Sequence, residues 1–152
     1  MATAESCTGG LIAGACTDLA GSSDWFERGF VTYSNAAKTD LLGVPADLID
    51  AHGAVSEPVA RAMAATQRAP VQLSVAVTGV AGPGGGSAAK PVGTVWLAWC
   101  SVGSEGGTPN VWAQCKHFAG DRAAVRQATV QRALQGLLAV ARGADPTNET
   151  SR

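Results

Sequence analysis

The sequence predicts an α/β domain in which helices cover both faces of a mixed central sheet. Short apolar runs that suit strands alternate with segments whose apolar residues recur at helical spacing. The last two strand-like runs, residues 94–101 and 111–118, are separated by a glycine-rich stretch too short for a crossover helix, so we expect a hairpin. With 152 residues, of which 46% are apolar, the chain is long enough for one core.

The amino-terminal segment predicts a strand end, a tight polar turn and a helix. Residues 2–4 suit the strand and residues 5–10 the turn. We expect the helix over residues 8–19, because apolar side chains recur there at helical spacing. These are Leu11, Ile12, Cys16 and Leu19.

A second strand and two short helices are expected next. Residues 29–34 are β-branched and aromatic, which favours a strand. The helices are predicted over residues 36–42 and 46–51. Gly43 ends the first of them and Pro45 helps to open the second.

A longer helix and a buried strand follow. Ser56 is expected to cap the helix, which has the Glu57 carboxylate in its first turn and runs to about Arg68. The short apolar run over residues 73–78 predicts a buried strand.

The carboxyl-terminal part predicts one long helix capped by Asp121. Its core-facing stripe consists of Val125, Val130, Leu134, Leu137, Leu138 and Ala141. Residues 79–93 and 103–110 are expected to be loops. We predict one domain over residues 1–142 and a frayed tail over residues 143–152, which lack apolar periodicity.

Composition excludes several classes of function. A net charge of −1 gives no basic footprint for nucleic acid, and no apolar run is long enough to span a membrane. No basic start followed by an apolar core points to export, and the four cysteines form no CxxC pair, so we expect a reducing cytoplasm. We expect no metal site, because the cysteines and histidines are too scattered along the chain to bind one ion together. These residues are Cys7, Cys16, Cys100, Cys115, His52 and His117.

The first candidate site is the strand–turn–helix segment that contains Ser6. A serine at such a turn can attack a carbonyl while neighbouring backbone amides hold the oxyanion. The alternative is that Ser6 or Thr8 caps the helix and the glycines permit close packing. Cys7 is a competing nucleophile at the same turn, or else a small buried thiol.

The second candidate is the pair Tyr33 and Lys38, at a strand end and a helix start. A desolvated lysine loses its proton more easily and can act as a general base towards a serine hydroxyl. The alternative is a surface lysine beside an interfacial tyrosine.

Two further segments are candidates for binding. The glycine-rich stretch from Thr78 to Ser87 can bring bare backbone amides to a ligand, or it is only a flexible connection. Arg122 and Arg126 lie in a helix's first turn, where the helix dipole disfavours positive charge, so they either face an anion or are simply solvated.

These motifs resemble the CinA C-terminal domain family, whose enzymatic members hydrolyse nicotinamide mononucleotide. The matching stretches are TAESCTGG (3–10), GSSDWFERGFVTYSNAAK (21–38), HGAVSEPVA (52–60), TGVAGPGGGS (78–87), KPVGTVW (90–96) and GDRAAVR (120–126). The resemblance implies a three-layer α/β/α sandwich. It also implies conversion of the carboxamide to nicotinic acid mononucleotide and ammonia in pyridine-nucleotide salvage, without a metal or other cofactor.

The resemblance also implies roles for individual residues. Ser6 would be the nucleophile, and Tyr33 and Lys38 would handle its proton. Arg122 would clamp the phosphate. The other residues expected to line the substrate are Thr8, Gly9, Thr78, Gly79 and Gly82.

A rival hypothesis is a non-catalytic nucleotide-binding module that acts through a partner. The presence of Ser6, Tyr33, Lys38 and Thr78 together favours catalysis. The family pattern has a helix ahead of Thr3, so either the natural start lies upstream or another subunit covers this flank. Together with the low charged fraction of 15%, this leads us to expect a homo-oligomer.

Overall fold

The structure is a computed structural model that describes residues 1–65, 69–103 and 107–148. The strands are β1 (Ala2–Glu5), β2 (Arg28–Val31), β3 (Leu73–Gly79), β4 (Thr94–Ser101) and β5 (Asn110–His117). The helices are α1 (Leu11–Thr17), α2 (Asn35–Leu42), α3 (Ala46–His52), α4 (Glu57–Ala64) and α5 (Arg122–Ala141), with a 3₁₀ turn η1 (Ser22–Asp24).

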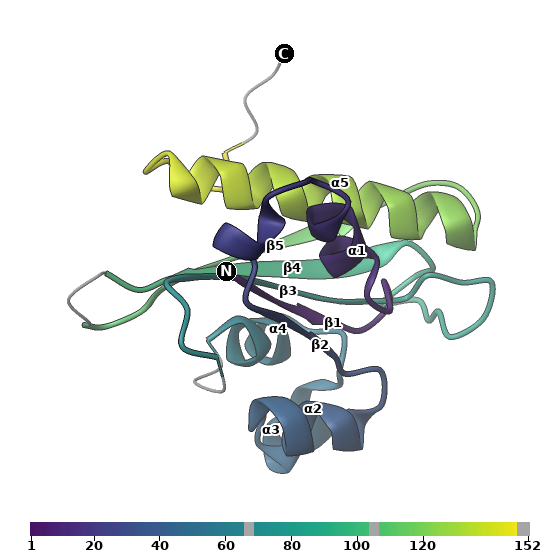
Figure 1. Cartoon of the computed structure of the whole chain (residues 1–152). Helices are drawn as coiled ribbons and strands as arrows, with labels where there is room; N and C mark the ends of the chain where they lie inside the picture. Colours follow the sequence, from purple (N-terminus) through teal and green to yellow (C-terminus); the bar gives the residue numbers. More distant parts are fainter. Residues whose placement is uncertain (66–68, 104–106, 149–152) are drawn as a thin grey trace.

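The strands form one mixed sheet in the order β2-β1-β3-β4-β5. The first three strands are parallel, whereas β3, β4 and β5 pair in antiparallel fashion. Helices α1 and α5 cover one face, and α2, α3 and α4 lie on the other (Figure 1). The predicted α/β fold with a mixed central sheet is therefore confirmed.

Each face of the sheet has its own apolar core. On the α4 face, Val59 and Met63 pack with Ala76 of β3. On the α5 face, Val77 packs with Val125 and its neighbours. Because the central strands are buried on both faces, they read as continuous apolar runs instead of alternating ones.

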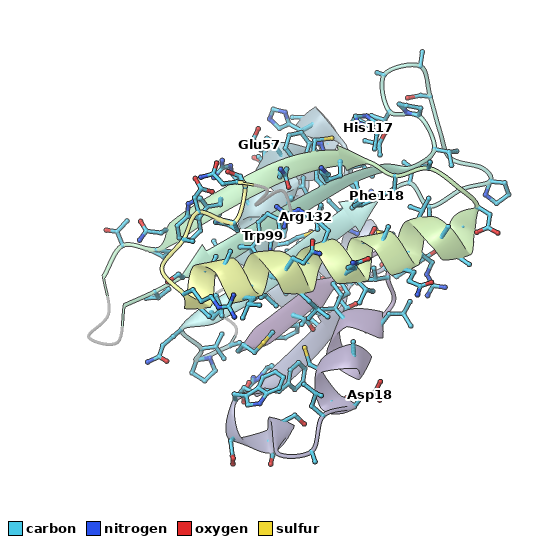
Figure 2. All side chains as sticks on the ribbon, turned by 90° about the horizontal axis from the view of Figure 1, so that it is seen from above. Asp18, Glu57, Trp99, His117, Phe118 and Arg132 are labelled. Carbon is cyan, nitrogen blue, oxygen red and sulfur yellow. The ribbon has the colours of Figure 1, made fainter. Side chains whose placement is uncertain are left out.

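Trp99 determines how closely α5 approaches the sheet. Figure 2 shows Trp99 and Arg132 between α5 and the strands. The indole nitrogen of Trp99 donates to the Ala133 carbonyl at 3.0 Å, and the Arg132 guanidinium lies over the ring at 4.9 Å. A Cβ at Gly136 would lie 2.2 Å from the indole, so only glycine permits this contact.

Two predicted boundaries were wrong, each for a local reason. Helix α1 begins only at Leu11, because Gly9 and Gly10 have φ values of +59° and +103°. Strand β2 ends at Val31, before the predicted position, and Ser34 instead caps α2 by accepting from the Ala37 N–H at 3.0 Å.

The two predicted caps have different outcomes. The Asp121 carboxylate accepts from the Ala124 N–H at 2.9 Å, which confirms that cap. Ser56 occupies the predicted N-cap position of α4, but its hydroxyl donates to the Gly53 carbonyl at 2.7 Å instead of accepting from the first turn of the helix.

Part of the segment predicted as a tail is held against the body of the protein. Pro146 is buried, and its carbonyl accepts from Arg132. The Thr147 carbonyl accepts from Gln114 of β5 at 3.1 Å. Three predicted segments lie partly outside the described residues. They are the last residues of the tail (149–152), the end of the helix predicted to reach Arg68, and the centre of the loop predicted over residues 103–110.

In the described part of the chain, no helix is both long and apolar enough to cross a bilayer.

Candidate active site

Three hydroxyl side chains lie in a row where the parallel strands end. The register of β2, β1 and β3 places Thr32, Ser6 and Thr78 side by side, with Ser6 in the middle. The backbone bonds continue to this row, since Thr32 N–H donates to the Glu5 carbonyl at 2.8 Å. Side chains at one register position point to the same face, so all three lie on the face covered by α2.

Lys38 of α2 extends its amine into this row. Its Nζ lies 3.0 Å from Ser6 Oγ, 2.9 Å from the Thr32 carbonyl and 3.4 Å from the Tyr33 carbonyl. The side chain is only 1% exposed. The Ser34 cap fixes where α2 begins, and Lys38 lies one turn later, over the Ser6 hydroxyl.

Burial and the available partners favour the neutral form of this amine. Burial lowers the pKa of Lys38, and no described carboxylate forms an ion pair with it. A neutral amine has two N–H groups and one lone pair. The carbonyls of Thr32 and Tyr33 only accept, so they take the two N–H groups. In the neutral form, the lone pair therefore faces Ser6, whose O–H can donate to it.

Glu5 fixes the turn that carries Ser6, and the sequence patterns missed this role. Its carboxylate is 1% exposed. It accepts from the Thr8 hydroxyl at 2.6 Å and from the N–H groups of Ile12 and Ala13 at 2.8 and 2.9 Å. A carboxylate just ahead of a helix was the available signal, because it can satisfy the free N–H groups of the first turn. The same bond shows that the Thr8 hydroxyl is directed to Glu5.

Cys7 is a poor nucleophile in this setting. Its side chain is buried among apolar residues of the α5 face. Burial raises the pKa of the Cys7 thiol to about 11, so almost no thiolate exists near neutral pH. The geometry therefore favours Ser6 over Cys7 as the attacking group.

We expect the Cys7→Ala variant to keep its catalytic rate within about threefold of the wild type, because the thiol plays no part in the chemistry. The measurement is kcat for amide hydrolysis. Cys16→Ala, which removes another buried thiol, controls for lost packing. A loss of several orders of magnitude in Cys7→Ala alone would make Cys7 the nucleophile.

Two arginines of α5 attach this helix to the loops of the candidate site. Arg126 donates to the carbonyls of Cys7 and Thr8 at 3.1 and 3.3 Å. Arg122 donates to the Gly82 carbonyl at 2.9 Å and to the Tyr33 hydroxyl at 3.0 Å. The two carbonyl groups that accept from Arg126 explain why this cation lies in the first turn of α5. Arg122 lies on the exposed rim of the site.

Tyr33 is placed differently from Lys38. Its ring is 61% exposed, and among the described residues its hydroxyl bonds only to Arg122. Only the Tyr33 backbone carbonyl reaches the Lys38 amine. The structure thus brings Ser6 and Lys38 together and leaves the Tyr33 hydroxyl at the rim.

The glycine-rich loop closes the other side of the site. Thr78 donates its hydroxyl to the Ala54 carbonyl at 2.9 Å. A Cβ at Gly79 would lie 2.7 Å from the Val95 side chain, so packing against β4 requires glycine there. Gly82 has φ +84° and holds Arg122, and the exposed Gly9 lies beside Arg126.

No three His, Cys, Asp or Glu side chains among the described residues lie close enough to share a metal ion.

The sequence of this chain is similar to those of known proteins. The model of the CinA C-terminal domain matches residues 1–141. The nicotinamide-nucleotide amidohydrolase PncC of Pseudomonas putida is 56% identical over 140 residues, which cover 91% of this chain and 84% of that protein. A CinA-like protein of Akkermansia muciniphila is 52% identical over 150 residues, 97% of this chain but 35% of its own length.

A solved structure gives the same picture. The competence/damage inducible protein CihA from Agrobacterium tumefaciens superposes with a TM-score of 0.85 at 50% identity, covering 92% of this chain and 84% of that one. The chain spans only about a third of the length of the longer relatives.

Proposed function

Because the chain belongs to the CinA C-terminal domain family, we propose that it hydrolyses the carboxamide of nicotinamide mononucleotide to nicotinic acid mononucleotide and ammonia. The observation that carries this proposal is the 3.0 Å approach of the buried Lys38 amine to Ser6 Oγ. A serine paired with a neutral amine is suited to acyl transfer. The relatives named as amidohydrolases supply the substrate class.

The proposed reaction begins with attack by Ser6 on the carboxamide carbon. The Ser6 O–H bond breaks, the proton moves to the Lys38 lone pair, and the carbonyl oxygen becomes an oxyanion. The carbon–nitrogen bond then breaks, and the nitrogen takes the proton from Lys38 and leaves as ammonia. Lys38 next takes a proton from water, whose oxygen attacks the acyl carbon. The bond from this carbon to Ser6 Oγ then breaks, and Lys38 returns the proton to the Ser6 oxygen as the acid is released.

Substrate contacts are proposed for the residues around this pair. Arg122 is proposed to exchange its bonds to Gly82 and Tyr33 for the phosphate, which a guanidinium binds through two parallel bonds. Thr78 and the backbone of Gly79 and Gly82 are proposed to line the nicotinamide and ribose. The turn at Thr8 and Gly9 closes the opposite side.

The direct test is to incubate the purified chain with nicotinamide mononucleotide and measure ammonia and nicotinic acid mononucleotide together. We expect both products in equal amounts. Tight binding without turnover would contradict the proposal and favour the non-catalytic module instead.

Arg122→Met is expected to raise KM for the mononucleotide about ten- to a hundredfold with a smaller change in kcat, because a charged hydrogen-bonding pair is lost. Nicotinamide riboside lacks the phosphate, so its kcat/KM should be the same in both proteins. Steady-state kinetics with the two substrates make the comparison.

Arg142→Met is the matched control, since Arg142 is exposed at the far end of α5. It should change neither substrate's parameters. An equal loss for mononucleotide and riboside in Arg122→Met would show that Arg122 supports the fold of the rim and not the phosphate.

We also propose a cytoplasmic location and self-association. The described structure holds four free cysteines, which suits a reducing compartment. Large apolar side chains at Leu19, Trp25 and Leu138 are 62%, 41% and 50% exposed, which favours contact with another subunit.

A further inference from the structure

Thr32 carries a buried hydroxyl that the reaction described above does not use. The residue is 0% exposed. Its Oγ1 is the one buried side-chain polar atom, among the described residues, that has no hydrogen-bond partner. Leaving such a group unpaired costs stability, so its presence in a well-packed site requires an explanation.

The position of Thr32 suggests what that explanation is. It lies next to Ser6 in the row of hydroxyls, one strand spacing away, which is about 4.8 Å. Its own carbonyl accepts from the Lys38 amine at 2.9 Å. The other two hydroxyls of the row are already paired, Ser6 with Lys38 and Thr78 with the Ala54 carbonyl.

The partners of Lys38 change during the reaction. The neutral amine has two N–H groups, which the carbonyls of Thr32 and Tyr33 accept. When the amine takes the Ser6 proton, it gains a third N–H while the Ser6 oxygen becomes bonded to carbon. Until the proton passes to the leaving nitrogen, the only other acceptor for this N–H among the groups described above is the Ser6 oxygen, so a further acceptor nearby would stabilise the ammonium.

We infer that Thr32 is a positioning residue whose hydroxyl accepts this third N–H and thereby steadies the protonated Lys38. The inference rests on the proposed function. The hydroxyl has no partner in the structure, and the additional N–H that it would accept exists only after proton transfer. A bond made in this state and absent in the ground state accelerates the reaction.

The test compares Thr32→Val with Thr32→Ser. Valine has nearly the shape of threonine without the hydroxyl, so we expect kcat to fall about ten- to a hundredfold with KM unchanged. The midpoint of thermal unfolding should rise by about 3 °C, because an unpaired buried hydroxyl is removed. Thr32→Ser keeps the hydroxyl and should recover most of the wild-type kcat.

Thr129→Val is the matched control. Thr129 is also 0% exposed, but its hydroxyl donates to the Val125 carbonyl at 2.7 Å within α5. This variant should lose stability and keep its kcat. Lower activity with higher stability is thus the signature expected of Thr32→Val only.

Covalent labelling of Ser6 by a small fluorophosphonate, followed by intact-protein mass, gives a second readout independent of the substrate. Thr32→Val should slow labelling about as much as it lowers kcat. If the wild type is labelled but does not hydrolyse the mononucleotide, the proposed function is overturned. The role of Thr32 is then still tested by the labelling rate of Thr32→Val relative to the wild type. The inference would be overturned if Thr32→Val hydrolysed and was labelled as fast as the wild type, or if Thr32→Ser lost as much activity as Thr32→Val. It would also be overturned if the wild type showed neither hydrolysis nor labelling.

Discussion

Ser6→Ala is expected to lower kcat for nicotinamide mononucleotide hydrolysis by roughly four to six orders of magnitude. Removing the hydroxyl removes the atom that bonds to the carboxamide carbon, and no neighbouring group replaces it. The nearest alternative, the Cys7 thiol, is protonated because burial raises its pKa to about 11. Binding of the mononucleotide should persist, because the substitution leaves the proposed phosphate contact at Arg122 in place.

The Ser74→Ala variant controls for the loss of a buried serine. Ser74 lies at the opposite end of β3, where its hydroxyl donates to the Ala64 carbonyl at 2.6 Å. It should lose stability and retain turnover. A Ser6→Ala enzyme within tenfold of the wild type would remove Ser6 from the reaction.

Lys38→Met is expected to lower kcat by about two to four orders of magnitude, the usual contribution of a general base. Methionine fills a similar volume but has no lone pair to take the Ser6 proton. Lys90→Met is the control, because the Lys90 amine also donates to a carbonyl, that of His52 at 3.0 Å, without contacting Ser6. An active Lys38→Met enzyme would exclude the amine as the base.

The pH profile of kcat/KM follows from the same amine. Only neutral Lys38 can accept the proton, so the rate should rise with pH and level off above the pKa of Lys38. Because burial disfavours the ammonium, that pKa is lowered and the rise occurs below the range of an exposed lysine. The residual rate of Lys38→Met should lack this rise.

Much of the fold could be predicted because its signals are local. The apolar runs of β3 and β4 and the Asp121 cap depend on a few neighbouring residues, and the structure confirms all three. The start of α1 could not be placed from apolar spacing. The positive φ values of Gly9 and Gly10 delay it, and the Glu5 carboxylate replaces a conventional cap.

The candidate site also combines contacts that follow from local chain order with one that does not. Ser6 and Lys38 end up together because β1 and β2 are adjacent parallel strands and α2 follows β2 directly. The bond between Tyr33 and Arg122 joins residues 89 positions apart, and it depends on how α5 meets the Gly82 loop. No pattern within either segment encodes that contact.

The central claim is that burial beside Ser6 lowers the pKa of the Lys38 amine, whose neutral form then serves as the base, and nuclear magnetic resonance of the lysine side chains measures this pKa directly. The chain has three lysines, Lys38, Lys90 and Lys116, and only Lys38 is fully buried, so its resonances can be assigned with Lys38→Met. We expect the resonance that is absent from the variant to show a pKa lowered from the ordinary lysine value, because the amine is buried. If this resonance instead titrates at the ordinary lysine value, the amine is charged at rest and the proposed role of Lys38 as the base is contradicted.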